Sequence, residues 1–223
     1  MKPLIVANWK MNPQTLAEAK RLFSSVAKGM RNVKKTEVVI CPPFLYIRQL
    51  PNVKYSLEMG AQDCFWQEKG AFTGEISPAM LKNSGCQYVI VGHSERRKYQ
   101  GETGEVINKK IKAVLAAGLK PILCIDSLSQ LKKELRGVLG KVIVAYEPLF
   151  AIGTGRPCSI EKAGKMRKMI EVPQVLYGGS VNPQNATDYI LKAGFQGLLV
   201  GGVSLNPEQF LQTVNNIEKA GKN

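Results

Sequence analysis

Short, continuously apolar runs alternate with segments of helical periodicity along the whole chain, and this alternation leaves few possible folds. Six clear runs lie at residues 4–7, 38–40, 88–91, 121–125, 142–145 and 198–200, and two weaker ones at 57–62 and 174–177. Continuous apolar runs are typical of strands that are buried on both faces, which are parallel strands. The sequence therefore predicts eight parallel strands.

Helical segments lie between these runs. One face of a predicted helix carries four leucines, Leu128, Leu131, Leu135 and Leu139. A second helix, which Ser159 is expected to cap, buries Ile160, Ala163, Met166 and Ile170. Apolar residues at this spacing form one stripe of an α-helix, and serine is a favoured residue at the start of a helix.

Eight β/α units are best explained by a single (β/α)8-barrel domain that spans residues 1–223. No linker rich in Pro, Gly or Ser divides the 223 residues into two parts, and one barrel commonly needs more than 200 residues. The alternative is an open, doubly wound sheet. That fold favours a G-x-G-x-x-G turn after its first strand, whereas Asn8-Trp9-Lys10 occupies this place.

The chain is strongly basic, with 31 Lys and Arg against 17 Asp and Glu and a formal net charge of +14. Such an excess can attract nucleic acid or a small anionic substrate. No basic run is interleaved with aromatic residues, as single-strand binders require. We therefore expect most of these charges on a solvated surface, and no nucleic-acid partner.

Five widely spaced cysteines form neither a C-x-x-C pair nor a zinc-ligand pattern, so reduced buried thiols and no metal site are expected. No apolar run reaches the length of a signal peptide or a membrane span. The expected location is cytoplasmic, without membrane attachment.

Polar residues and glycines directly follow several predicted strands. In a parallel barrel the loops after all strands converge on one face, where active sites lie. These residues are Asn8, Lys10, His93, Glu147, Gly178, Gly179, Ser180, Gly201 and Gly202. The sequence therefore predicts one site that combines an imidazole, a carboxylate, an ammonium and an anion-binding backbone.

His93 is the only histidine, and Ser94 and Glu95 after it resemble a helix cap and first turn. A neutral ring at this position can donate a hydrogen bond, although a purely structural histidine is the alternative. Glu147 emerges from an apolar strand, which favours a basic carboxylate. A salt-bridged rim glutamate is the alternative there.

The loop at residues 149–155, which follows Pro148, combines apolar residues with Gly153 and Gly155. Exposed apolar residues of this kind suit a lid that closes over a ligand and excludes water. The glycine pairs after the last two strands let backbone N–H groups approach an anion. A phosphate monoester is the predicted ligand, and no Walker A motif points to a nucleotide.

Seven longer motifs extend around or lie between these polar residues and glycines. They are Ala7-Asn8-Trp9-Lys10-Met11-Asn12, Ala71-Phe72-Thr73-Gly74-Glu75-Ile76-Ser77-Pro78, Val91-Gly92-His93-Ser94-Glu95-Arg96-Arg97, Ala145-Tyr146-Glu147-Pro148, Ala151-Ile152-Gly153-Thr154-Gly155, Tyr177-Gly178-Gly179-Ser180-Val181 and Leu199-Val200-Gly201-Gly202. In these motifs, which are long, keep one order and cover nearly the whole chain, the sequence resembles the triosephosphate isomerase family.

The resemblance implies a cofactor-independent interconversion of dihydroxyacetone phosphate and D-glyceraldehyde 3-phosphate through an enediolate. Glu147 would move the proton, neutral His93 would polarise the carbonyl, and Lys10, supported by Asn8, would supply positive charge. The resemblance also assigns supporting roles. Gly153, Ser180, Gly201 and Gly202 would hold the phosphate, Tyr177 with Ser180 would latch the lid, and Glu95 would lie near Lys10.

The resemblance further implies a homodimer. Residues 64–72 are similar to the interdigitating loop of the family's dimer, whose tip threonine is Thr73 here. Thr73 would reach the region of the partner's Asn8 and the partner's Glu95.

The chain also departs from the family pattern. Asp126-Ser127 replaces the usual Gly-Glu, Phe150 replaces a lid tryptophan, and Arg156 stands at the common lysine position. Cys124 and Glu147 are 23 positions apart, and Gly155 and Tyr177 are 22 apart. Both separations are shorter than usual, so we expect reduced fifth and sixth helical units that affect stability and lid support more than catalysis.

Two rival functions stay open at this point. A different phosphosugar aldose–ketose isomerase would share the glycine pairs but would not need Lys10, His93 and Glu147 together. A catalytically retired barrel that binds nucleic acid through its basic surface would have lost at least one of these three residues.

Overall fold

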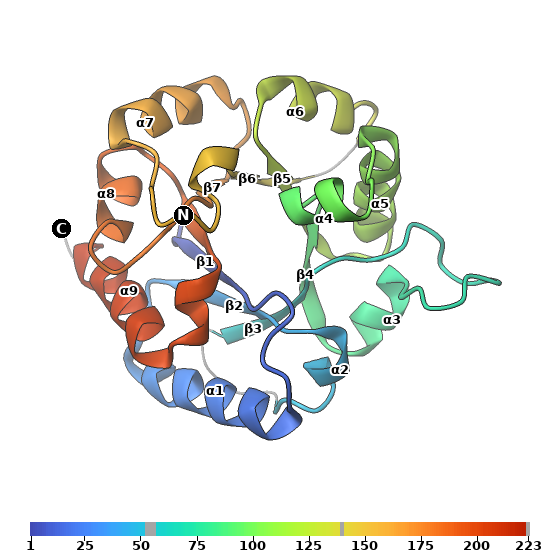
Figure 1. The fold of residues 1–223 in the computed structure, drawn as a ribbon, viewed down its shortest axis with the longest axis horizontal. Helices are drawn as coiled ribbons and strands as arrows, with labels where there is room; N and C mark the ends of the chain where they lie inside the picture. Colours follow the sequence, from blue (N-terminus) through green and yellow to red (C-terminus); the bar gives the residue numbers. More distant parts are fainter. Residues whose placement is uncertain (52–56, 139–140, 222–223) are drawn as a thin grey trace.

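Eight parallel strands close into a barrel in the computed structural model, which describes residues 1–51, 57–138 and 141–221 (Figure 1). The strands follow one another around the barrel in chain order, and β1 pairs with β8 through Leu4 and Gly197. Their bounds are β1 Leu4–Asn8, β2 Glu37–Cys41, β3 Leu57–Ala61, β4 Cys86–Val91, β5 Lys120–Ile125, β6 Ile143–Tyr146, β7 Val175–Tyr177 and β8 Gly197–Val200. The predicted (β/α)8 barrel is confirmed, and the open doubly wound sheet is wrong because the two end strands pair.

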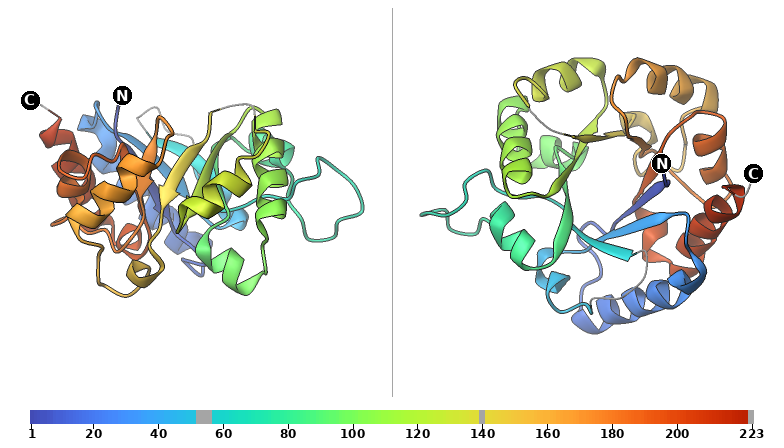
Figure 2. Two further views of the ribbon diagram at one scale, coloured as in Figure 1. Left: turned by 90° about the horizontal axis from the view of Figure 1, so that it is seen from above. Right: turned by 180° about the vertical axis from the view of Figure 1, so that it is seen from behind.

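Helices surround the barrel on its outside, as Figures 1 and 2 show. The α-helices are α1 Leu16–Gly29, α2 Phe44–Ile47, α3 Pro78–Asn83, α4 Ser94–Tyr99, α5 Gly104–Ala116, α6 Leu128–Glu134, α7 Ile160–Met169, α8 Ala186–Leu191 and α9 Pro207–Ala220. The described residues also form three 3-10 helices, η1 Met30–Asn32, η2 Leu149–Ala151 and η3 Gly202–Leu205. None of the described helices is long and apolar enough to cross a membrane.

Local sequence explains where the helices begin. Thr15 and Glu18 form a reciprocal capping box at the start of α1, which satisfies two backbone N–H groups that the helix leaves free. Ser159 accepts a hydrogen bond from the backbone N–H of Lys162 and caps α7, as the sequence predicts.

Two apolar clusters hold the barrel together. The inner cluster fills the barrel with side chains such as Val6, Val39, Ile90 and Leu176, and the outer cluster lies between the strands and the helices. Burial of one such side chain stabilises the fold by about 1.5–3 kcal/mol. The barrel interior is therefore a packed core, and ligands are confined to its rim.

The helices of the fifth and sixth β/α units, α6 and α7, are shorter than the helices of the first and last units. Helix α6 has seven residues and α7 has ten, whereas α1 and α9 have 14 each. Helix α6 ends at Glu134 with Leu135 as its cap, so the predicted helix stops before Leu139, a residue that lies outside the described part of the chain.

A long segment between β3 and α3 projects away from the barrel in both views of Figure 2. We call residues 65–75 the arm. The rings of Phe65 and Trp66 lie 4.0 Å apart, and those of Phe65 and Phe72 lie 4.8 Å apart. Phe72 nonetheless remains 42% exposed. The arm thus presents apolar surface away from the body of the protein.

Candidate active site

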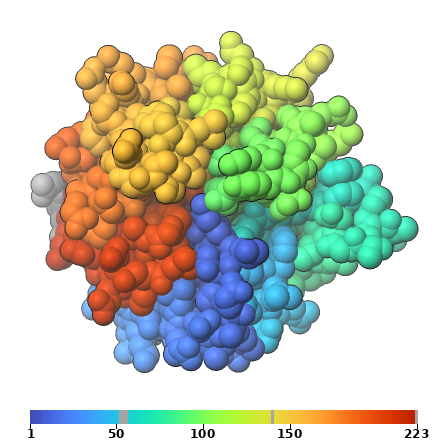
Figure 3. Space-filling model, in the orientation of Figure 1, coloured from blue at the N-terminus to red at the C-terminus, as the bar shows by residue number. Residues whose placement is uncertain are grey.

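The predicted site residues come together at the carboxyl ends of the strands. Figure 3 shows this face, where segments that follow β1 (blue), β6 (yellow-orange) and β8 (red) meet. A cavity of about 280 Å³ opens there. Nine residues predicted for the site line it, namely Asn8, Lys10, His93, Glu147, Gly153, Gly178, Ser180, Gly201 and Gly202, whereas Gly179 is not in its lining. Its wall also includes residues that the sequence analysis did not single out as ligand contacts, among them Ile152, Asn182, Leu199 and Val203.

Lys10 is held by its backbone as well as by its side chain. Its φ of 54° lies in the left-handed region, which a non-glycine residue adopts only when its surroundings enforce it. The Lys10 N–H donates to Asn8 Oδ1 at 3.0 Å, and Gln62 Nε2 donates to the Lys10 carbonyl at 2.7 Å. The ammonium pairs with Glu95, as the sequence predicts. Gln62 was missed, although its position directly after β3 could have revealed it.

His93 itself caps helix α4, which corrects the expectation that Ser94 is the cap. The ring atom Nδ1 accepts a hydrogen bond from the Glu95 backbone N–H at 3.2 Å, and Ser94 is the first residue of the helix. A ring nitrogen that accepts a hydrogen bond carries no proton, so the neutral ring bears its proton on Nε2. Nε2 faces Glu147, with 3.3 Å between Nε2 and Oε1.

Glu147 is buried with only 3% of its surface exposed. Its backbone N–H donates to the Ile125 carbonyl at 2.8 Å, whereas Oε2 has no hydrogen-bond partner among the described residues. A Cβ atom at position 178 would lie 2.9 Å from Glu147 Cγ. The glycine at 178 therefore leaves room for the glutamate side chain.

The Glu147 carboxylate is less basic than its apolar strand suggests. Burial raises its pKa. His93, Cys124 and Lys10 together lower the pKa by more than burial raises it, so the net direction is down from the usual value. The raised pKa expected from the sequence is therefore wrong for this arrangement, because the neighbours of the carboxylate outweigh its desolvation.

Opposing effects also act on the pKa of His93. Burial lowers this pKa and Lys10 acts in the same direction, but the carboxylates of Glu147 and Glu95 raise it, and the net direction is up. The hydrogen bond from the Glu95 N–H to Nδ1 favours the neutral ring, since a protonated Nδ1 could not accept it.

The predicted lid lies over the cavity. It consists of η2 and the turn that contains Gly153 and Gly155, and Leu149 and Phe150 are 58% and 61% exposed. The Ser180 hydroxyl donates to the Ala151 carbonyl. The Tyr177 hydroxyl accepts from the Cys158 N–H at 2.9 Å. Tyr177 thus holds the segment that follows the lid, while Ser180 contacts the lid directly.

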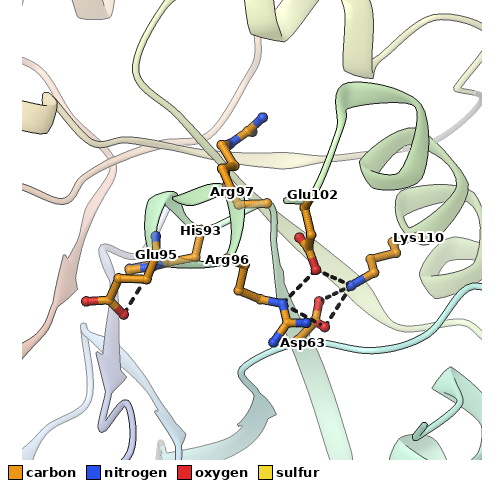
Figure 4. Close-up of polar contacts among 8 residues, drawn as sticks. Asp63, His93, Glu95, Arg96, Arg97, Glu102 and Lys110 are labelled. Atoms are coloured by element: carbon orange, nitrogen blue, oxygen red, sulfur yellow. Dashed lines mark hydrogen bonds and ion pairs between the residues drawn. The ribbon is translucent and has the colours of Figure 1, made fainter. Parts of the chain in front are cut away.

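A second cluster of charges lies beside the base of the arm (Figure 4). Asp63 and Glu102 share two cations, and we call these four residues, Asp63, Arg96, Glu102 and Lys110, the charge cluster. Lys110 Nζ lies 2.8 and 2.7 Å from the two Asp63 carboxylate oxygens, and Arg96 Nε lies 2.9 Å from Asp63 and 2.6 Å from Glu102. The cluster joins the base of the arm to α4 and α5.

Burial affects the two acids of the charge cluster differently. It raises the pKa of Asp63 to about 6 despite the opposing effect of Lys110. For Glu102, burial is outweighed by Lys110 and Arg96, and the net pKa is lowered.

The described part of the chain contains no group of three or more His, Cys, Asp or Glu side chains placed to hold a metal ion. All five cysteines are free and buried.

Comparisons with known proteins all point to one family. The family model described as triosephosphate isomerase matches residues 3–217. The chain is 43% identical to the triosephosphate isomerase of Dehalococcoides mccartyi strain CBDB1 over an alignment 242 positions long, which covers 95% of each chain. It is 41% identical to that of Aquifex aeolicus, with 96% of this chain and 99% of the relative covered. The crystal structure of triosephosphate isomerase from Bartonella henselae is similar, with a TM-score of 0.83, 28% identity and coverage of 98% and 100%.

Proposed function

This chain belongs to the triosephosphate isomerase family, and from that membership we propose a reaction in which Glu147 is the base and neutral His93 the electrophile. The reaction interconverts dihydroxyacetone phosphate and D-glyceraldehyde 3-phosphate. The observation that carries the proposal is the 3.3 Å approach of His93 Nε2 to Glu147 Oε1 inside a cavity that Lys10 also lines.

Glu147 removes a proton from the carbon next to the carbonyl, which leaves an enediolate. The carboxylate then returns this proton to the neighbouring carbon, while His93 passes the hydroxyl proton from one enediolate oxygen to the other, so no atom is gained or lost. General-base catalysis of this kind contributes about 10²- to 10⁴-fold to the rate. The lowered pKa of Glu147 keeps the carboxylate ionised and ready to accept a proton.

A substrate between Glu147 and His93 changes the environment of the base. It separates the carboxylate from the imidazole, which is the first of the neighbours that lower its pKa. Closure of the lid removes water at the same time. Both changes make the carboxylate more basic at the moment of proton transfer.

His93 and Lys10 stabilise the charge that develops on the substrate oxygens. The Nε2–H of a neutral imidazole donates a hydrogen bond to the carbonyl oxygen as it becomes negative, and Lys10 places a fixed positive charge in the same cavity. Donors aimed at developing charge are the largest contribution in many enzymes.

The phosphate of the substrate lies opposite, against Gly153, Ser180, Gly201 and Gly202. All four residues line the cavity, and glycines allow backbone N–H groups to approach an anion closely. The cavity of about 280 Å³ suits a small phosphate ester.

The proposed enzyme is a homodimer in which the arm of one protomer inserts into its partner. Support comes from the projection of the arm and from the exposure of Phe72 and Thr73 at its end. A second copy that covers the arm would bury this apolar surface.

The test is replacement of Glu147 by Gln in a coupled assay with glyceraldehyde 3-phosphate. We expect kcat to fall at least about 10²-fold, because the amide cannot accept the proton. The control is Glu161→Gln, since Glu161 is an exposed residue of α7 with a similar side chain. A Glu147→Gln variant with nearly unchanged kcat would refute the assignment, and a parent protein that does not convert this substrate would favour a different phosphosugar isomerase.

A further inference from the structure

A partly buried arginine connects three elements behind the catalytic residues. Arg97 Nε donates to the Gly92 carbonyl at 2.7 Å, and Nη2 donates to the Cys124 carbonyl at 2.7 Å. These two carbonyls belong to the ends of β4 and β5. Figure 4 shows that Arg97 points away from its neighbour Arg96, which belongs to the charge cluster.

Glu134 holds this arginine in place. Its two carboxylate oxygens accept from Nη1 and Nη2 of Arg97 at 2.6 and 2.9 Å. This is the bidentate geometry that matches a guanidinium to a carboxylate and fixes both planes. The Glu134 side chain is 1% exposed, and Asn108 Nδ2 of α5 donates to its backbone carbonyl at 2.7 Å. Glu134 is thus fixed by both its side chain and its backbone.

The two carbonyls that Arg97 binds lie next to the catalytic groups. Gly92 directly precedes His93, and Cys124 directly precedes Ile125, whose carbonyl accepts from the Glu147 backbone N–H at 2.8 Å. Position 92 also requires a glycine, since its φ is 69° and a Cβ there would lie 2.9 Å from Arg97 Nη2. A change in the Arg97 guanidinium would therefore move the backbone beside both the imidazole and the base.

A stabilising role alone would not explain this ion pair, in which Glu134 is buried and Arg97 partly buried. Removal of two charges from water can cost more free energy than their attraction returns, so a buried ion pair is weak evidence for stability. Two bonds from the same guanidinium to backbone carbonyls on adjacent strands instead determine geometry.

We propose that Glu134, in the shortened helix α6, is a positioning residue of this enzyme: through Arg97 it fixes the ends of β4 and β5 and so the separation of the His93 ring from the Glu147 carboxylate. The proposal rests on the proposed function. It assigns a role in the active site to a helix that lies outside the barrel rim.

Asp126 is the other carboxylate that acts on Arg97. It lies in the loop after β5, where its N–H donates to Gln130 Oε1 at 2.9 Å. If Glu134 loses its charge, Arg97 can turn toward Asp126 and release the Gly92 and Cys124 carbonyls.

The experiment compares Glu134→Gln and Glu134→Asp with the parent protein, and uses Glu105→Gln on the exposed face of α5 as the matched control. Glutamine places an amide donor against a guanidinium donor, and aspartate keeps the charge but withdraws it by one methylene. Each variant is assayed for kcat and KM with glyceraldehyde 3-phosphate, for thermal unfolding, and for the His93 ring signals by ¹⁵N NMR. His93 is the only histidine, so its signals need no further assignment.

We expect Glu134→Gln to lower kcat about 10-fold or more with KM changed by less than about 3-fold, because small displacements of catalytic groups slow the reaction steeply. The His93 Nε2 signal should shift in the same variant. Glu134→Asp should show a smaller fall in kcat and a smaller shift of this signal. Glu105→Gln should resemble the parent.

The proposal is overturned if the variants melt earlier but keep kcat within about 2-fold and leave the His93 signals in place, because Glu134 would then be structural only. It is also overturned if neither variant folds. If the parent protein does not convert the substrate, the proposed function fails. The His93 signals then still report whether Glu134 positions the ring.

Discussion

Replacement of Lys110 by Met should destabilise the protein strongly, because two buried carboxylates would lose a shared cation. Lys110 is 3% exposed, and its ammonium contacts both oxygens of Asp63 and one oxygen of Glu102. Methionine preserves most of the apolar stem and removes the charge. Arg96 would then be the one cation left in the charge cluster.

The expected loss in the free energy of unfolding at pH 7 is about 3–5 kcal/mol, which is the usual cost of removing one partner from a buried ion pair. This is a large part of a net stability of about 5–15 kcal/mol. The Lys109→Met variant is the matched control, because Lys109 is half exposed and pairs with the exposed Glu105 at 3.0 Å. Exposed pairs on a helix contribute only about 0.3–0.5 kcal/mol.

The destabilisation should also depend on pH. The pKa of Asp63 is about 6 in the fold, against a usual value of 3.8, and this difference corresponds to roughly 3 kcal/mol. A carboxyl group with a raised pKa favours the fold below its usual pKa and loses that contribution as pH rises through the folded value. Without Lys110 the pKa of Asp63 rises further, so the variant should be closer to the parent at pH 5 than at pH 7.

Urea unfolding followed by circular dichroism measures this difference, at pH 5 and pH 7 and at one fixed protein concentration. A fixed concentration is needed because association alters apparent stability. The reasoning is refuted if Lys110→Met is no less stable than Lys109→Met, or if its destabilisation is the same at both pH values.

Three further predictions follow from the site, the charge and the arm. The Glu147 and Glu95 carboxylates raise the pKa of His93, but the ring should still be neutral at pH 7 with its proton on Nε2, because a protonated Nδ1 would lose the hydrogen bond from the Glu95 N–H; ¹⁵N NMR that shows an imidazolium would contradict this. The net charge of +14 should accelerate capture of the anionic substrate, so kcat/KM should fall as ionic strength shortens the screening length to about 10 Å at 0.1 M salt, whereas a flat dependence would mean that the charges are merely solvated. Thr73→Arg should shift sedimentation toward the single protomer while the fold stays intact by circular dichroism, and an unchanged dimer population would exclude the tip of the arm from the interface.

The fold was predictable because the strands are apolar on both faces. Six of the eight strands stand out as continuous runs, and even the weak run at 174–177 corresponds to β7, which has three residues. Closure of the barrel could be inferred from the number of units. The end of α6 was less predictable, because the leucine pattern continues past Glu134 whereas the helix ends there.

The cavity lining was predictable for a related reason. Chemistry in a parallel barrel is restricted to strand ends, so polar residues in those places are candidates. Interactions between distant segments were not predictable. The lowered pKa of Glu147 depends on side chains from three other strand ends, and the link from Glu134 through Arg97 joins residues 37 positions apart. The residue pattern within one segment does not show how close its side chains lie to those of a distant segment.

The prediction that Ser94 caps helix α4 was wrong for a different physical reason. Serine commonly caps helices, but the imidazole one residue earlier accepts the hydrogen bond instead. Use of the His93 ring as a cap explains how its tautomer can be fixed by the backbone.

In the proposed homodimer, the arm makes the lifetime of the protein depend on its concentration. Residues 67–75 are exposed and contain neither helix nor strand, and exposed loop chain of this kind is where proteases cut. A second copy that encloses the arm shields it, whereas a lone protomer offers Lys69 and Phe72 to proteases that cleave after basic or aromatic residues. In the proposed homodimer, dissociation would therefore be followed by cleavage, and subunits made without a partner would be removed first.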